Sequence, residues 1–238
     1  MLKAMIDRIT ELATPKTYEF ENQLLSSHPL HFVMPKKARP KSIEVTGLDS
    51  ICKLVRNEVM HIGKRLFIQV KSYNEVVVFT TLDDEEERFR MYTCTADTPA
   101  VTTGRYMAYE NAVIELRSLY IPTPDQEYLL KLISSISKES KVTSSDNGVT
   151  QQVEAKSGIA LKENVTVKPR VTLRPFRTFI EVDQPESEFL LRINDRAEIG
   201  VFPADGGVWK LEATRNVAGY FEEALKDLIE AEAVVVIR

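Results

Sequence analysis

Cysteine, histidine and tryptophan are scarce in this chain, which has two cysteines, three histidines and one tryptophan among 238 residues. Cys52 and Cys94 lie far apart, in a helix-like and a strand-like run, so we expect buried free thiols in a reducing compartment. His28 and His31 flank Pro29, which favours extended chain over the helical spacing that would bring two metal ligands together. The sequence therefore predicts no bound metal and no cofactor.

Long apolar runs are absent as well. No segment approaches the ~18 consecutive apolar residues that a membrane-spanning helix needs. The first residues, MLKAMIDRITELATPK, contain acidic side chains and lack the apolar core of a signal peptide. We therefore expect a cytoplasmic protein that does not associate with a membrane.

Recognised catalytic and phosphate-binding motifs are also missing. The chain contains no G-x-S-x-G elbow, no G-x-G-x-x-G fingerprint and no G-x-x-x-x-G-K-[ST] loop. The sequence thus names no catalytic residue, and an enzyme is not the favoured interpretation. With a formal net charge of -4, the whole molecule is not an electrostatic nucleic-acid binder, although a local basic patch stays possible.

What is present indicates an ordinary globular composition, 43% hydrophobic and 28% charged. Hydrophobic periodicity predicts an α+β protein with largely antiparallel sheets and peripheral helices. We expect helices over 2–13, 48–62, 109–120 and 125–137, and a last helix capped by Thr214. We expect strands over 30–34, 42–45, 65–71, 75–81, 88–95, 149–156, 165–173, 177–183, 188–194, 198–203 and 207–212.

The polar segment 138–148 predicts a linker between two subdomains. Residues 1–137 would form an N-terminal region with a helix, a β-meander and a helical pair, and residues 149–238 a β-rich C-terminal region with a final helix and strand. The apolar run Val234 to Ile237 should pair within a sheet or with another copy of the chain, so we expect a homo-oligomer.

Asp205, Gly206 and Gly207 form the sharpest turn signal in the chain. We expect a β-hairpin turn there, in which the glycines supply the positive φ that such a turn requires. Trp209 follows directly, and its large apolar area favours a place in the core over a role as a ligand platform.

A basic stretch lies upstream of this turn, with Lys168, Arg170 and Arg174 sharing even parity with the aromatic Phe176, and Arg177 directly after. Alternate residues of a strand lie on one face, so this parity could gather the cations beside a stacking ring. That combination is typical of a single-strand or nucleotide groove.

The alternative is a solvated sheet face whose basic side chains are balanced by Glu181, Asp183 and Glu188. A second basic segment, Lys36 to Lys41, is interpreted as a loop. For an enzyme, the polar residues to inspect first would be Arg177, Glu181, Asp183 and Asp205.

Three motifs, GVTQQVEAKSGIA, VTLRPFRTFIEVDQPESEFLLRI and FPADGGVWKLEA, stand in order over residues 148–213. In order and spacing they resemble the YfdQ-like family of prophage and temperate-phage proteins, and the resemblance continues weakly through 114–136 but not over 1–105. The function of that family is unknown. The resemblance implies a phage origin and an intracellular, non-structural role, and it supplies no catalytic residues.

These observations together predict a phage-encoded, intracellular, non-enzymatic binding protein that assembles with itself. Its partner would be a host or defence protein, in host takeover or counter-defence. The alternative is a nucleic-acid-binding accessory of phage DNA replication or recombination, and the third is a hydrolase-like enzyme with an unrecognised site.

Overall fold

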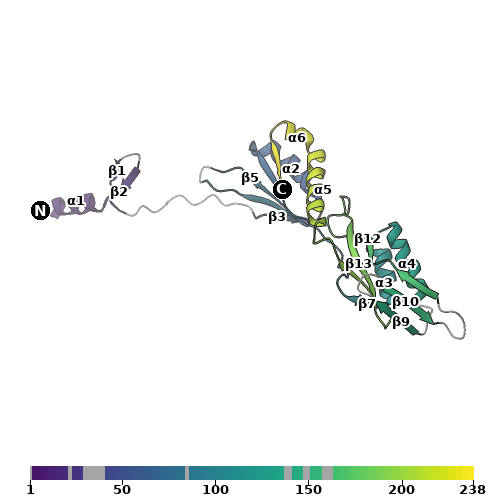
Figure 1. Cartoon of the computed structure of the whole chain (residues 1–238). Coiled ribbons are helices and arrows are strands. Elements are labelled where there is room, and N and C mark those ends of the chain that lie inside the picture. The colour runs from purple at the N-terminus through teal and green to yellow at the C-terminus, as the bar shows by residue number, and fades with distance from the viewer. Residues whose placement is uncertain are drawn as a thin grey trace. The chain divides into compact units, whose positions relative to one another are not determined.

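The computed structural model of the chain describes residues 2–20, 23–28, 41–83, 86–136, 141–146, 151–156 and 163–238 (Figure 1). Contacts within the chain divide it into two units, Met1–Pro40 and Lys41–Arg238. The first unit contains helix α1 (Leu2–Ala13) and an antiparallel hairpin of β1 (Thr17–Phe20) and β2 (Gln23–Ser26). The strand expected at 30–34 and most of the basic loop expected at 36–41 lie outside the described residues.

The second unit has an α+β fold with mostly antiparallel sheets, as predicted. One five-stranded sheet has the order β15-β4-β5-β6-β3, antiparallel in its centre and parallel at both edges. The terminal apolar run is edge strand β15, in which Val234 lies opposite Leu66 of β4. The strands are β3 (Ile43–Val45), β4 (Leu66–Ser72), β5 (Glu75–Thr80), β6 (Arg90–Thr95) and β15 (Val234–Ile237).

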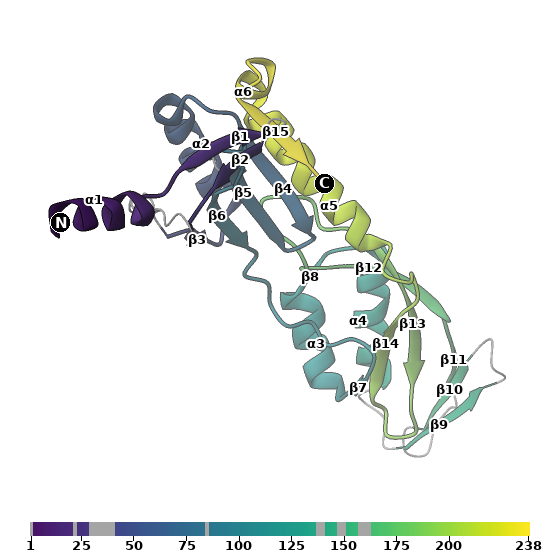
Figure 2. The same cartoon turned by 90° about the vertical axis from the view of Figure 1, so that its left-hand side faces the viewer.

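Helices α2 (Leu48–Ile62) and α5 (Trp209–Ala224) pack on this sheet and form the first lobe (Figure 2). Helix α2 forms because Leu48, Ile51 and Val55 recur on one face and are buried, and it ends at Gly63, which has a φ of 60°. The core of this lobe combines these residues with others from the strands and from α5, among them Ile68, Val78, Cys94, Val217, Ala218 and Phe221.

The second lobe is built on another five-stranded sheet, of order β7-β14-β13-β12-β8, which α3 and α4 cover. In β13 every second residue from Ser187 to Ile193 is buried, the alternation of a strand with one covered face. The elements are β7 (Tyr106–Met107), α3 (Tyr109–Ser118), β8 (Tyr120–Ile121), α4 (Pro124–Ile136), β12 (Arg170–Pro175), β13 (Ser187–Ile193) and β14 (Ile199–Pro203).

The expected division at 138–148 does not separate these lobes. Helices α3 and α4, from the expected N-terminal region, belong to the second lobe, whereas α5 and β15, from the expected C-terminal region, belong to the first. Residues 141–146 of the expected linker form β9 (Lys141–Asp146) in a three-stranded antiparallel sheet with β10 (Gln151–Lys156) and β11 (Glu163–Val167). The other residues of 138–148 lie outside the described part.

Two expected strands are absent from the described chain. Residues 177–183 form a loop, because Pro175 ends β12 and Phe179 turns into the core of the first lobe. Residues 209–212 begin α5, which continues to Ala224 and is followed by the short helix α6 (Lys226–Glu230). Thr214 therefore lies inside the helix and does not cap it, and its hydroxyl donates to the Lys210 carbonyl.

Among the described residues, no helix is both long enough and apolar enough to cross a membrane.

Candidate binding pocket at the junction of the two lobes

The candidate site is a pocket at the junction of the two lobes. Two described segments, 96–105 and 204–208, run from one lobe to the other, and the loop 176–186, which joins β12 and β13 of the second lobe, reaches into the core of the first lobe with Phe179 and returns. A cavity of about 410 Å³ lies where residues of all three meet the turn between β4 and β5. The side chains that give it chemical character are Tyr73, Arg177, Asp205, Trp209 and Lys210.

Arg177 and Trp209 form the centre of this pocket. The guanidinium carbon of Arg177 lies 3.8 Å from the centroid of the Trp209 ring, and its Nη2 donates to Ser187 Oγ at 2.5 Å. Burial lowers the pKa of Arg177 to about 10, although the nearby Asp205 carboxylate opposes that change. The buried Nε of Arg177 finds no hydrogen-bond partner among the described residues, so one donor of this cation is left unsatisfied.

Asp205 is held in the pocket wall by the residues around it. Ser187 Oγ donates to Asp205 Oδ2 at 2.7 Å, and the Gly207 N–H donates to Asp205 Oδ1 at 3.0 Å. Burial alone would raise the pKa of this carboxyl, but these hydrogen bonds and the Arg177 charge outweigh it and hold the pKa below its usual value. Asp205 is therefore ionised at neutral pH and fixed in place.

The Asp205-Gly206-Gly207 turn was expected to close a hairpin, and it instead leads into α5. The positive φ expected of the glycines is present, 61° at Gly206 and 85° at Gly207. Since the turn directs the chain into a helix, Trp209 stands at the helix start, half-buried in the pocket wall, and not in the core where we expected it.

Tyr73 and Lys210 complete the pocket, and sequence reasoning gave neither of them a functional role. The Tyr73 ring meets the Trp209 ring edge to face at 4.8 Å, and Lys210 Nζ lies 5.4 Å from the Tyr73 centroid. Only their positions in the sequence could have indicated such a role, because Tyr73 lies in a tight turn and Lys210 directly follows the single tryptophan. The charged lining residues are thus two cations and one carboxylate, a locally positive site on an acidic chain.

Gln184 holds the crossover loop that carries Arg177. Its side chain is buried, its Oε1 accepts from the backbone N–H groups of Arg177 and Thr178, and its Nε2 donates to the carbonyls of Phe179 and Val182. The Thr178 hydroxyl donates to the Tyr73 carbonyl and joins this loop to the first lobe. The position of the guanidinium is therefore set by backbone contacts that the sequence did not reveal.

The expected basic groove is only partly assembled. Along β12, Arg170, Thr172 and Arg174 do lie on one face, as strand alternation predicted. Lys168 Nζ, however, pairs with Asp125 at 3.0 Å and lies over the Tyr128 ring, and Arg170 pairs with Glu188 at 2.5 Å.

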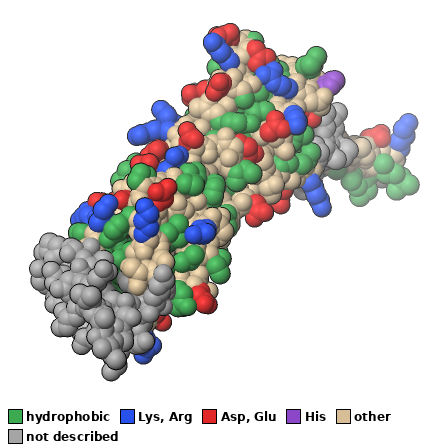
Figure 3. Space-filling model, turned by 90° about the vertical axis from the view of Figure 1, so that its right-hand side faces the viewer, with side chains coloured by type: hydrophobic (Ala, Val, Ile, Leu, Met, Phe, Trp, Pro, Cys, Tyr) green, Lys and Arg blue, Asp and Glu red, His purple; other side chains and the backbone are tan. Residues whose placement is uncertain are grey.

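The remaining members of the expected groove do not extend it. Arg174 Nε donates to the Gln184 carbonyl, and Phe176 is half-buried. Arg177 does not lie on this face, because it lines the junction pocket. On the face of the molecule seen in Figure 3, basic and acidic side chains are interspersed. The ion pair between Glu188 and Arg170 agrees with the alternative of a solvated sheet face. Glu181 and Asp183 take no part in this balance of charge.

Of the four polar residues singled out for an enzyme, the structure brings only two together. Arg177 and Asp205 share the junction pocket. Glu181 Oε1 accepts from the Leu48 N–H at the start of α2, and Asp183 accepts from Asn216 through its backbone carbonyl.

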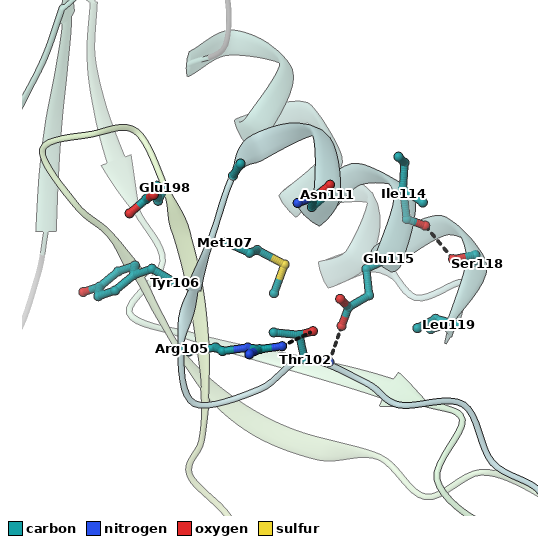
Figure 4. A pocket seen from close by; sticks show the side chains of 11 residues that line it. Thr102, Arg105, Tyr106, Met107, Asn111, Ile114, Glu115, Ser118, Leu119 and Glu198 are labelled. Atoms are coloured by element: carbon teal, nitrogen blue, oxygen red, sulfur yellow. Dashed lines mark hydrogen bonds between the residues drawn. The ribbon is translucent and has the colours of Figure 1, made fainter.

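A second, larger cavity of about 560 Å³ lies between α3 and the segment that leads into β7 (Figure 4). Its charged groups are Arg105, Glu115 and Glu198. Arg105 Nη2 approaches the Thr102 hydroxyl at 3.5 Å, Glu115 accepts from the Thr102 backbone N–H, and Glu198 accepts from Asn194. Glu115 and Glu198 are thus each held by a hydrogen bond to a nearby segment of the same chain. With one cation and two carboxylates in its lining, this cavity is less positive than the junction pocket.

Cys52 and Cys94 are both buried and unpaired, as expected. Burial raises the pKa of the Cys52 thiol to about 11 and that of Cys94 to about 12. Within the described ranges, no three His, Cys, Asp or Glu side chains come together as metal ligands.

No family model, no curated protein and no solved structure matches this chain.

Proposed function

We propose that this chain is a binding protein whose junction pocket receives an acidic segment of a protein partner. The observation that carries the proposal is the presence of a half-buried Arg177, whose buried Nε has no hydrogen-bond partner among the described residues, together with Lys210 in one aromatic-walled pocket. Its volume of about 410 Å³ lies within the range of about 300–1,000 Å³ common for ligand pockets. A carboxylate with an apolar neighbour is the chemistry that such a lining would recognise.

The ring geometry supports a side chain as the occupant, not a nucleic-acid base. Tyr73 and Trp209 meet edge to face, with an interplanar angle of 63°, so the two rings do not form a parallel slot for a base. The guanidinium of Arg177 already lies over the Trp209 ring. The nucleic-acid alternative would instead depend on the outer face of β12, where Lys168 and Arg170 are already paired with acids.

The resemblance of residues 148–213 to the YfdQ-like family supports a place for this binding inside a phage-infected or lysogenic bacterial cell. A phage protein without its own catalytic machinery would act by occupying a host or defence protein. We therefore propose host takeover or counter-defence as the setting, and capture of an acidic surface segment as the mechanism.

The single tryptophan makes the proposal directly measurable, because Trp209 is the only source of indole fluorescence and lines the pocket. The probe is the peptide N-acetyl-Glu-Phe-Glu-amide, compared with the same peptide carrying Lys in place of Glu. We expect a saturable change in Trp209 emission with the acidic peptide that weakens as salt is added. The basic peptide should produce no saturable change.

The variant Lys210→Glu should abolish the response because it reverses the exposed cation of the pocket. Lys226→Glu is the matched control, since Lys226 is also an exposed lysine, on α6, and is not among the residues that line this pocket. Equal responses to both peptides, or an unchanged response in Lys210→Glu, would contradict the proposal.

A further inference from the structure

The cavity between α3 and the segment that leads into β7 gathers charged side chains that the proposed function does not use (Figure 4). Its volume of about 560 Å³ lies within the range of about 300–1,000 Å³ common for small-molecule sites. All 11 residues that line it are described and belong to the unit Lys41–Arg238. The walls of this cavity are therefore formed by one unit alone.

One wall of the cavity is a polar face of α3. The helix is anchored by Ala112 and Leu116, which are buried in the core of the second lobe. On the neighbouring face, residues at intervals of three, four and three line the cavity, namely Ala108, Asn111, Glu115 and Ser118. The helical repeat thus fixes the core contact and the polar wall at the same time.

The opposite wall brings a cation close to the carboxylate of Glu115. Arg105 and Glu115 approach Thr102 from two sides in Figure 4. Arg105 Nη2 lies 3.5 Å from the Thr102 hydroxyl oxygen, at the outer limit of a hydrogen bond, and Glu115 Oε1 accepts from the Thr102 N–H. Within the described chain, neither charged group has an ion-pair partner, although both line the same cavity. Each therefore keeps capacity to bind a ligand.

We propose that this cavity binds a small zwitterion with an apolar side chain, which is either a free amino acid or a short peptide with both ends free. The ligand carboxylate pairs with Arg105, whose planar guanidinium matches a carboxylate, and the ligand ammonium pairs with Glu115. The apolar side chain lies against the apolar lining residues, Met107, Ile114 and Leu119. The Asn111 amide, which has no hydrogen-bond partner among the described residues, both donates and accepts at the same wall.

The balance of charge in the cavity favours a ligand that carries both signs. Its lining contains one cation, Arg105, and two carboxylates, Glu115 and Glu198. Glu198 Oε2 is already held by Asn194 Nδ2 at 2.7 Å. A ligand with only a carboxylate would meet repulsion from two acids, and a ligand with only an amine would leave Arg105 without a partner.

The first test compares three ligands that share one side chain, by saturation-transfer NMR on the full chain. L-Leucine carries both charges, 3-methylbutylamine lacks the carboxylate, and 4-methylpentanoate lacks the ammonium. We expect saturable binding of L-leucine and binding weaker by about tenfold or more for the other two, because each loses a charge-assisted hydrogen bond. Equal binding of either single-charge ligand would overturn the proposal.

The dipeptide L-leucyl-L-leucine distinguishes the two sources of the zwitterion. Tighter binding of L-leucine than of the dipeptide would assign the cavity to free amino acids, and the reverse order would assign it to short peptides. No saturable binding of either ligand would overturn the proposal.

The second test uses charge-neutralising variants of the cavity. Arg105→Gln and Glu115→Gln should each weaken binding of the preferred ligand by about tenfold or more. Glutamine at 115 keeps an oxygen that accepts from the Thr102 N–H, so the wall stays in place. Arg117→Gln is the matched control, since Arg117 is an exposed arginine on α3 that is not among the lining residues. Unchanged affinity in Arg105→Gln and Glu115→Gln, with a native circular dichroism spectrum, would overturn the proposal.

The variant Lys210→Glu separates this cavity from the junction pocket, since Lys210 lines only the latter of the two. It should leave L-leucine binding unchanged, and Arg105→Gln should leave the Trp209 response to the blocked acidic peptide unchanged. Loss of L-leucine binding in Lys210→Glu would place the zwitterion in the junction pocket and overturn the proposal.

Discussion

The guanidinium of Arg177 lies over the indole ring of Trp209, 3.8 Å from the ring centroid. The two residues belong to different segments at the junction of the lobes, the 176–186 loop that reaches into the first lobe and the turn that leads into α5. Their contact therefore joins these two segments and forms one wall of the junction pocket at the same time. Stability and ligand binding should depend on the same pair.

Replacing Arg177 with alanine should lower the free energy of unfolding by about 1–3 kcal/mol, because the variant loses the contact with Trp209 and the hydrogen bond to Ser187. Emission from Trp209 should shift to longer wavelength as water reaches the ring. Arg170→Ala, at an exposed ion pair, should change stability by less than about 0.5 kcal/mol. Urea unfolding followed by fluorescence and circular dichroism measures both, and equal effects would contradict a special role for Arg177.

Gln184→Ala should be among the most destabilising polar substitutions, at about 2–4 kcal/mol, because it leaves the buried backbone groups around residues 177–182 without partners. Gln69→Ala, at an exposed position of β4, is the control and should cost well under half as much. The loss of unfolding free energy in the two variants can be compared directly by urea titration. Similar losses would mean that the loop is held by other contacts.

Replacing Gly206 and Gly207 with valine should destabilise the chain by about 1–3 kcal/mol per site, because β-branched residues resist the positive φ of this turn. Gly219→Ala provides the contrast. Gly219 lies inside α5 with no atom within 4 Å of the added Cβ, so alanine there should stabilise by about 0.5–1 kcal/mol. An unchanged melting temperature in the valine variants would show that the turn does not need positive φ.

Asp205 should make the stability depend on acid. Its folded-state pKa is lowered, so its contribution is present above the usual carboxyl value of about 3.9 and is lost as pH falls through the lower, folded value. Asp205→Asn should therefore flatten the fall of unfolding free energy below about pH 4. Asp183→Asn is the control, since Asp183 accepts from Asn216 through its backbone. An unaltered slope in Asp205→Asn would rule out this linkage.

Much of the local structure followed from side-chain periodicity. The predicted bounds of α2, 48–62, agree with the helix observed, because its apolar stripe and its terminal glycine are both short-range signals. The strands of the meander and the same-face placement of Arg170 and Arg174 were predicted on the same basis. The prediction of a strand over 207–212 was wrong. Ala213, Val217 and Phe221 follow one another at intervals of four residues and form the buried face of a helix that begins at Trp209.

The chemistry of the pocket could be predicted only in part. The sequence singled out three residues of the pocket, Arg177, Asp205 and Trp209. No periodicity, however, predicts that Tyr73 lies against Trp209. The sequence also indicated Lys168 and Arg170 as candidate binding cations. The acids that pair with them, Asp125 and Glu188, are 43 and 18 residues away along the chain. Which cations are neutralised is a consequence of contacts between distant residues.

Local signals in this chain thus determined where most helices and strands form, the α+β class and the sharp turn at Gly206 and Gly207. The tertiary structure decided which lobe each element joins, because the chain crosses between the lobes and each core collects residues from both sides of the expected boundary. It also decided that the guanidinium of Arg177 lies over the Trp209 ring in a pocket and not on a basic strand face. Periodicity describes one element at a time, whereas burial and ion pairing depend on what lies across the fold.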